Sequence, residues 1–198
     1  MSGGNYIAQA LVFLVRTVFD LYLIAVTLRF LFQLIKVDFY NPISQFLVKI
    51  TNPPLRILRR VIPGYGAIDW SSVVLMLTVK ACQIALISLI VSGRIPALSG
   101  LMLLSLSQII NLVIYIFIIA IFVQIILSWI NPGAYNPATA ILYQLTEPLL
   151  RPARRLLPPM GGLDLSPILV LVFLQLTIIL IVNPLAHMGQ NLAGYSLM

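Results

Sequence analysis

Four long apolar segments alternate along the chain with shorter, more polar connections. The segments cover approximately residues 8–35, 70–91, 101–130 and 166–185. The hydrocarbon core of a bilayer is about 30 Å thick, so a helix needs roughly 20 apolar residues to cross it. The first and third segments are long enough to tilt or to extend beyond that core. The pattern therefore predicts an all-α membrane protein with four transmembrane helices.

The connection after the first segment is repeated after the third. Residues 40–72 align without a gap to residues 135–167, an offset of 95 residues. The identical positions, numbered in the first copy, are Tyr40, Asn41, Pro42, Leu47, Thr51, Pro53, Leu55, Arg56, Arg59, Arg60, Pro63, Gly66, Asp69 and Ser71. Each unit would enter and leave the membrane in the same sense, so we expect two parallel tandem repeats, residues 1–98 and 99–198.

Each repeated connection shows the pattern of two short amphipathic helices. One would begin at Asn41-Pro42 and its copy at Asn136-Pro137, because asparagine is a good N-cap and proline suits the first turn. A second would begin at Pro53 or Pro148, since proline disfavours helical geometry in the residue before it. An arginine triplet marks one face of the second helix in each copy: Arg56, Arg59 and Arg60, then Arg151, Arg154 and Arg155. Such helices suit the membrane interface.

Composition and charge support this class and predict an orientation. The 198 residues are 61% hydrophobic and 9% charged, which is outside the range of soluble globular domains. The formal net charge is +7, and the basic residues gather in the two repeated connections. The positive-inside rule then places both connections in the cytoplasm and both termini outside, in the periplasm. Cys82 is the only cysteine, so we expect it to be a packing residue.

The ionisable residues inside the spans are Arg16, Asp20, Arg29 and Lys80. Asp20 and Lys80 each lie near the middle of antiparallel spans, so an ion pair between them is predicted, with Arg16 one turn away as a competitor. Two interpretations remain open: the pair fixes how the helices align, or these charges line an ion or proton pathway. The second repeat replaces all four by uncharged residues, namely Asn111, Tyr115, Gln124 and Gln175.

Two further groups of charges carry hypotheses. The arginine triplets either bind anionic lipid or an acidic partner, or serve only as topology signals. Asp69 and Asp164 follow the paired arginines of their own repeat across a glycine-containing turn. We expect each aspartate to form a salt bridge back to these arginines and to lock the loop helix against the next span; the alternative is a solvated loop aspartate.

Other chemistries find little support in the sequence. The arginines are accompanied by no nucleic-acid-binding module, so no nucleic-acid partner is expected. His187 has no nucleophile or orienting acid in a recognisable pattern, and we expect it to be a surface residue. No catalytic, nucleotide-binding, haem or zinc motif is present, so neither an enzyme nor a cofactor is predicted.

Several motifs resemble those of the YggT family of bacterial membrane proteins. They are D-F-Y-N-P at Asp38 to Pro42, P-x-L-R-x-x-R-R-x-x-P at Pro53 to Pro63, the glycine and Asp69 that follow, and the second copies at Tyr135 to Asp164. Asp20, Arg29 and Lys80 are also similar to the family pattern, whereas Pro152 stands where the first copy has Ile57. The two-repeat length resembles the proteobacterial form.

The resemblance implies an integral protein of the cell inner membrane without catalysis. Roles associated with the family are osmotic or potassium homeostasis, cell division and nucleoid organisation, and assembly of c-type cytochromes in plastids. From this we expect a scaffold or assembly factor whose partners are anionic lipid and either another membrane protein or further copies of the chain. The alternative is a small transporter or channel subunit in ion or osmotic balance, with Asp20, Lys80 and Arg29 lining its path.

Overall fold

The computed structural model describes residues 3–37, 40–62, 68–130, 136–157 and 164–194, and its elements are all helices. They are α1 (Gly3–Ile35), α2 (Pro42–Val61), α3 (Trp70–Ser92), α4 (Leu98–Ile130), α5 (Pro137–Leu156), α6 (Ser166–Thr177), a π-helical segment (Ile178–Val182) and α7 (Asn183–Ala193). Four stretches are long and apolar enough to cross a membrane: Tyr6–Ile35, Trp70–Ser92, Leu98–Ile130 and Ser166–Ala193. The predicted all-α membrane fold is confirmed.

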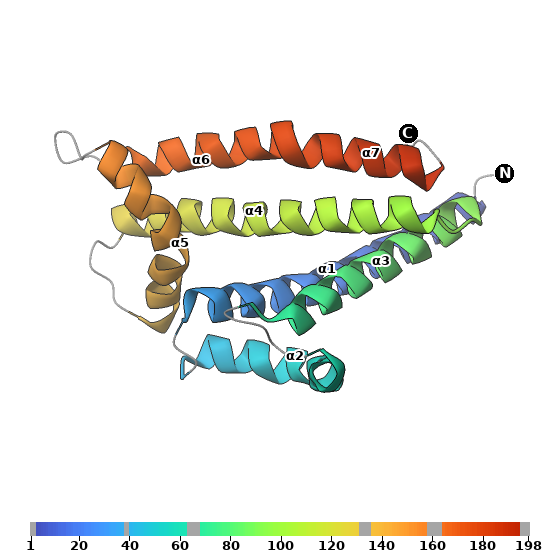
Figure 1. Cartoon of the computed structure of the whole chain (residues 1–198), viewed down its shortest axis with the longest axis horizontal. Coiled ribbons are helices and arrows are strands. Elements are labelled where there is room, and N and C mark those ends of the chain that lie inside the picture. The colour runs from blue at the N-terminus through green and yellow to red at the C-terminus, as the bar shows by residue number, and fades with distance from the viewer. Residues whose placement is uncertain (1–2, 38–39, 63–67, 131–135, 158–163, 195–198) are drawn as a thin grey trace.

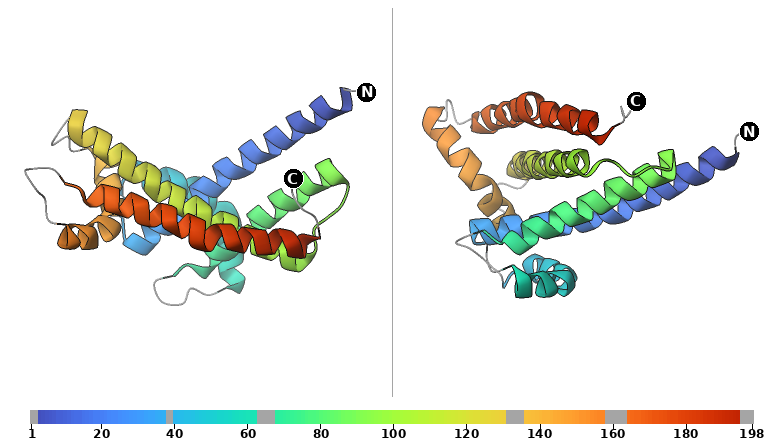
Figure 2. Two further views of the ribbon diagram at one scale, coloured as in Figure 1. Left: turned by 90° about the horizontal axis from the view of Figure 1, so that it is seen from above. Right: turned by 45° about the vertical axis from the view of Figure 1, so that its right-hand side comes forward.

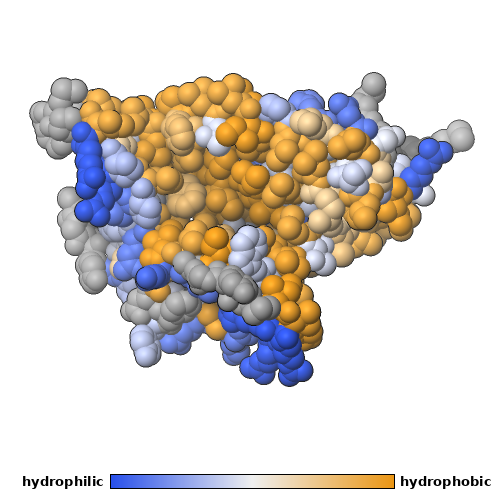
Figure 3. All heavy atoms as spheres, viewed as in Figure 1, coloured by the Kyte–Doolittle hydropathy of each residue, from blue (hydrophilic) through white to orange (hydrophobic). Residues whose placement is uncertain are grey.

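The two repeats are parallel, as predicted. Figure 1 shows α1 and α4 running in one direction and α3 and α6–α7 in the other, with α2 and α5 near the end where α1 and α4 finish. The spans form layers, with α6–α7 on one side of α4 and the α1–α3 pair on the other (Figure 2). Hydrophobic residues cover the spans, whereas hydrophilic residues gather over α5 and α2 (Figure 3).

The prediction of two short helices in each connection is wrong, because α2 and α5 each continue past their prolines. Pro53 and Pro54 lie inside α2, and Pro148 and Pro152 lie inside α5. A proline removes the hydrogen bond to the carbonyl four residues earlier. Most of those carbonyls belong to residues on the exposed side of the helix, such as Lys49 and Ile50, so polar surroundings can satisfy them. The prolines bend the helix: in Figure 1 the last turns of α2 point in a different direction from its first turns.

The fourth span also differs from its predicted end at residue 185, since helix continues to Ala193. Pro184 does not stop it because the π-helical segment directly before widens the turn where the proline ring would clash with the preceding backbone. The added helix α7 packs closely on α4. A Cβ built on Gly100 would lie 2.2 Å from the backbone nitrogen of Ala193. Small residues at such crossings let transmembrane backbones approach each other.

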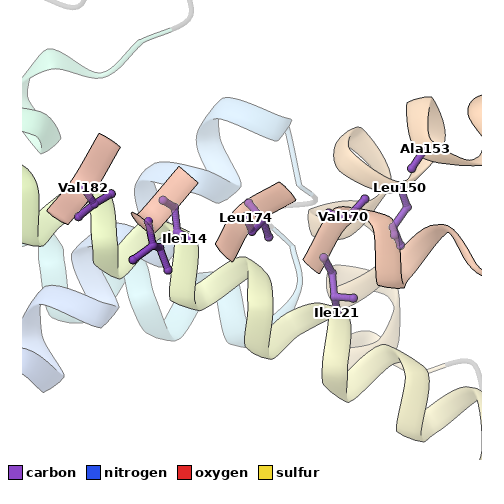
Figure 4. Packing of buried hydrophobic residues seen from close by; sticks show 8 residues of the cluster. Ile114, Ile121, Leu150, Ala153, Val170, Leu174 and Val182 are labelled. Carbon is purple, nitrogen blue, oxygen red and sulfur yellow. The ribbon is translucent and has the colours of Figure 1, made fainter. Parts of the chain in front are cut away.

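Apolar contacts hold each repeat together and join the two. In the second repeat one cluster fills the space between α4, α5 and α6–α7 (Figure 4). Its buried members are Ile114, Ile121, Leu150, Ala153, Val170, Leu174, Ile178 and Val182. A second cluster unites α1, α2 and α3, and Ile109 of α4 belongs to it. Leu31 of α1, Ala120 of α4 and Leu145 of α5 form a further contact between the repeats.

The α4–α7 crossing gives a prediction. Gly100→Ala should lower the free energy of unfolding by about 1–3 kcal/mol, the usual cost of overpacking, because the added Cβ meets backbone atoms that cannot move aside. Gly189→Ala is the comparison and should cost less, since its Cβ would meet the flexible Leu104 side chain at 2.9 Å and the Leu104 backbone nitrogen at 3.0 Å, whereas at Gly100 backbone atoms lie at 2.2–2.6 Å. Thermal unfolding in detergent measures both. Equal loss in the two variants would contradict a backbone-limited crossing at Gly100.

Candidate functional site: the loop helices and the intramembrane charges

In the first repeat, Asp69 joins the end of α2 to the start of α3. Arg59 Nη2 lies 2.5 Å from Asp69 Oδ2, and the Ser72 hydroxyl donates to the same oxygen at 2.8 Å. The Asp69 side chain is only 5% exposed. Burial alone would raise the pKa of this carboxyl, but the hydrogen bonds from Arg59 and Ser72 and the charge of Arg59 hold it below its ordinary value. Asp69 therefore stays ionised and keeps its arginine.

The second repeat builds the equivalent contact at the equivalent residues. Arg154 Nε lies 3.0 Å from Asp164 Oδ2, and Arg154 Nη1 lies 2.9 Å from Glu147 Oε2. Asp164 also accepts hydrogen bonds from the backbone N–H and the hydroxyl of Ser166, the first residue of α6. Burial acts to raise the pKa of Asp164, yet the bonds from Ser166 and Arg154 lower it overall. The salt bridges predicted for both aspartates are thus present, and in each triplet the middle arginine makes them.

The other two arginines of each triplet have a different environment. Arg56 and Arg60 on α2, and Arg151 and Arg155 on α5, are exposed. Among the described residues they have no hydrogen-bond or ion-pair partner. Each repeat therefore uses one arginine to hold its loop helix, while the other two are exposed and unpaired among the described residues.

A second contact anchors each loop helix to the span before it. The Arg29 side chain is buried, and its Nη1 donates to Thr51 Oγ1 at 2.7 Å and to the Val48 carbonyl at 3.3 Å. In the second repeat Thr146 donates to Gln124 Oε1 at the matching positions. Arg29 thus belongs to the α1–α2 contact. Sequence analysis did not assign the threonines, although the identity of Thr51 and Thr146 in the two copies was a usable signal.

The predicted Asp20–Lys80 ion pair is present between α1 and α3. Lys80 Nζ lies 3.2 Å from Asp20 Oδ1. Gln83, which sequence analysis missed, completes the cluster: it accepts from Lys80 at 2.7 Å and donates to Asp20 Oδ1 at 2.8 Å. Its position three residues after Lys80, on the same helix face, could have identified it. Arg16 does not compete for Asp20, since its side chain is exposed and only its carbonyl faces Gln83, at 3.4 Å.

The two repeats also meet at the starts of α2 and α5. Asn41 accepts a bond from its own helix at the Ile43 N–H and donates its Nδ2 to the Pro137 carbonyl at 2.8 Å. A cavity of about 360 Å³ lies beside this contact, lined by both asparagine–proline pairs and by Gln144. In the described part of the chain, no three His, Cys, Asp or Glu side chains gather in a way that could hold a metal ion.

Comparison with known proteins finds the same duplication. The CCB3/YggT family model matches twice, over residues 8–90 and 103–185. The chain belongs to the CCB3/YggT family. An uncharacterized protein of Pseudomonas aeruginosa is 42% identical over 189 residues, covering 95% of this chain and 94% of the relative. The uncharacterized protein YggT of Escherichia coli K12 is 40% identical over 167 residues, covering 84% and 86%.

A shorter relative matches less of the chain. The uncharacterized protein ycf19 of Porphyra purpurea is 35% identical over 69 residues, which is 34% of this chain and 73% of that protein. No solved structure matches the chain significantly. The two matches to the YggT family model begin and end at the same offset that relates Arg59 to Arg154 and Asp69 to Asp164, so both copies keep the family's unit.

The salt bridges of the loop helices predict that the protein loses stability in acid. Asp69→Asn should lower the free energy of unfolding by about 1–3 kcal/mol, as expected for hydrogen bonds to a charged group. Asp164→Asn should cost about 0–1 kcal/mol, because Asp164 and Arg154 are each more than a third exposed. Both carboxyl pKa values are lowered by folding, so this stability is present above the unfolded pKa of about 4 and is lost as the pH falls through the folded value.

The measurement is thermal stability in detergent from pH 7 to pH 3, with loop proteolysis as a second readout. The native chain should lose stability in acid, and Asp69→Asn should remove most of that pH dependence. Unchanged stability and unchanged protease resistance in the Asp69→Asn, Asp164→Asn double variant would show that these carboxylates do not hold the loop helices.

The intramembrane cluster gives a separate prediction. Asp20→Asn alone should destabilise the protein by about 2–3 kcal/mol, since it leaves Lys80 charged inside the span. Adding Lys80→Gln, the residue that the second repeat has at this place, should restore most of the loss. Thermal stability of the two single variants and the double variant measures the coupling. If the double variant lost as much stability as Asp20→Asn alone, or as much as the two single variants together, the ion pair would not be structural.

Proposed function

We propose that this chain is a scaffold or assembly factor of the cell inner membrane, with α2 and α5 at the cytoplasmic face. One observation carries the proposal: each repeat has one arginine bound to an aspartate and two arginines exposed on the same loop helix. The orientation rests on the positive-inside rule, which favours the cytoplasm for loops this rich in arginine. The scaffold role rests on the basic surface that α2 and α5 each present in a fixed position.

The chemistry of the exposed arginines favours anionic headgroups. Guanidinium groups bind phosphate oxygens in a bidentate way, and each basic residue near an anionic leaflet contributes about 1 kcal/mol. Arg56 and Arg60 are one helical turn apart, as are Arg151 and Arg155, so each pair can meet neighbouring phosphates. An acidic protein surface is the other ligand that such pairs could accept, and the experiment below separates the two.

A transport role is not proposed. That role required Asp20, Lys80 and Arg29 to lie along one path. Arg29 instead bonds Thr51 at the α1–α2 contact, while Lys80 and Gln83 both bond the same oxygen of Asp20. Hydrogen bonds that tie α1 to α3 in this way support helix alignment better than conduction.

Lipid binding can be tested with the two native tryptophans. Trp70 and Trp129 lie at the loop-helix end of α3 and α4 and are both exposed. In vesicles of neutral lipid doped with brominated phosphatidylglycerol, their fluorescence should be quenched more than with the same fraction of brominated phosphatidylcholine. Replacing Arg56, Arg60, Arg151 and Arg155 by Gln should abolish that excess quenching.

Two controls make the result specific. Lys36→Gln with Lys49→Gln removes two positive charges, the same number as the half-variant Arg56→Gln with Arg60→Gln, yet leaves both arginine pairs intact. It should therefore keep more of the excess quenching than that half-variant does. Arg94→Gln removes a charge from the opposite end of the spans and should have no effect. Equal quenching by both lipids in the native protein would exclude selective lipid binding and leave either an acidic protein ligand or a topology signal alone as the role of these arginines.

A further inference from the structure

One of the contacts between the repeats joins the last span of the first repeat to the first span of the second. Helix α3 of the first repeat packs on α4 of the second, and Val73 and Leu77 of α3 pack against the apolar cluster to which Ile109 of α4 belongs. By the 95-residue offset, α3 corresponds to α6 and α4 corresponds to α1. A matching contact would therefore place α6 on α1. In the described chain these helices lie on opposite sides of the layered spans (Figure 2).

The residues that would make this missing contact are exposed. Ile109 of α4 is 8% exposed, whereas its equivalent Leu14 of α1 is 57% exposed. Leu77 of α3 is partly buried, whereas its equivalent Val172 of α6 is 54% exposed. The same holds for Val73, whose equivalent on α6 is the exposed Ile168. Two complementary faces, one on α1 and one on α6, are thus left uncovered.

Lipid alone would suit a wholly apolar face, but the α6 face contains a polar group. Gln175 lies between Ile168 and Ile179 on the same side of the helix, is exposed, and has no hydrogen-bond partner among the described residues. It is the equivalent of Lys80, which pairs with Asp20 in the middle of the span. An amide at that depth is costly to leave against hydrocarbon, and interhelical hydrogen bonds are its usual solution.

We propose that copies of this chain assemble side by side in the membrane, with α6 of one copy packed on α1 of the next as α3 packs on α4 within the chain. The occupant is a second copy because the contact continues an interface that the chain already makes with itself. The contact uses two different faces, so it builds a ring or a row.

Cysteine cross-linking in native membranes tests this arrangement. In a Cys82→Ala background, Leu14→Cys combined with Val172→Cys should give a ladder of dimers and larger species on mild oxidation, while each single variant stays largely monomeric. Leu14→Cys combined with Phe173→Cys is the matched control, because Phe173 is exposed at the same depth on another side of α6. Adding Gln175→Leu should reduce the ladder, whereas Thr177→Val, whose hydroxyl bonds within its own helix, should not.

Three outcomes would overturn the proposal. Equal ladders from Val172→Cys and Phe173→Cys would mean random collision, and dimers from Leu14→Cys alone would mean a two-fold contact of α1 with itself. Absence of the ladder, together with the particle mass of one copy in detergent-free lipid discs, would mean that lipid covers both faces. The cross-linking readout does not depend on lipid selectivity, so it can succeed or fail separately from the proposed function.

Discussion

In each repeat an ionised carboxylate at the boundary between the loop helix and the next span is paired with an arginine, and this contact organises the repeat. Asp69 and Asp164 both stand just before a span, and both accept hydrogen bonds from an arginine behind them and a serine ahead of them. The arginine comes from the loop helix and the serine from the span. One ionised group therefore joins the two elements in each repeat. In the first repeat, where Asp69 is buried, removing either partner would leave a charge in a poorly solvated place, so the joint is most strongly specified there.

The repeats keep this joint but differ inside the membrane. The first repeat places Arg29, Asp20 and Lys80 where the second has Gln124, Tyr115 and Gln175. The contact to the loop-helix threonine survives the change, since an arginine donates to Thr51 in one copy and a glutamine accepts from Thr146 in the other. A threonine hydroxyl can both donate and accept, which explains how one residue type serves both partners. Helix alignment in the first repeat rests partly on charge, whereas the second relies on close packing at Gly100 and Gly189.

Sequence reasoning predicted the spans, their parallel order, the Asp20–Lys80 pair and both loop salt bridges, because charge and apolar length follow simple rules in a membrane. It failed where the surroundings override a local preference. Proline normally ends a helix, yet α2 and α5 continue because the carbonyls freed by Pro53 and Pro54 belong to exposed residues. The end of the last span was placed too early, since the polar sequence of α7 is helical only through its packing on α4. Gln83 was missed because a neutral side chain carries no charge signal of its own, although its spacing from Lys80 would have placed it beside the ion pair.

The structural and binding interpretations of the arginine triplets are not alternatives. Arg56, Arg59 and Arg60 are spaced i, i+3 and i+4, so they share one side of α2. Fixing Arg59 on Asp69 fixes the rotation of that turn about the helix axis, and with it the direction in which Arg56 and Arg60 point. The second repeat does the same through Arg154 and Asp164. Each exposed pair is therefore held in place by the arginine–aspartate salt bridge beside it, and a surface of this kind can recognise a ligand without first having to be ordered by it.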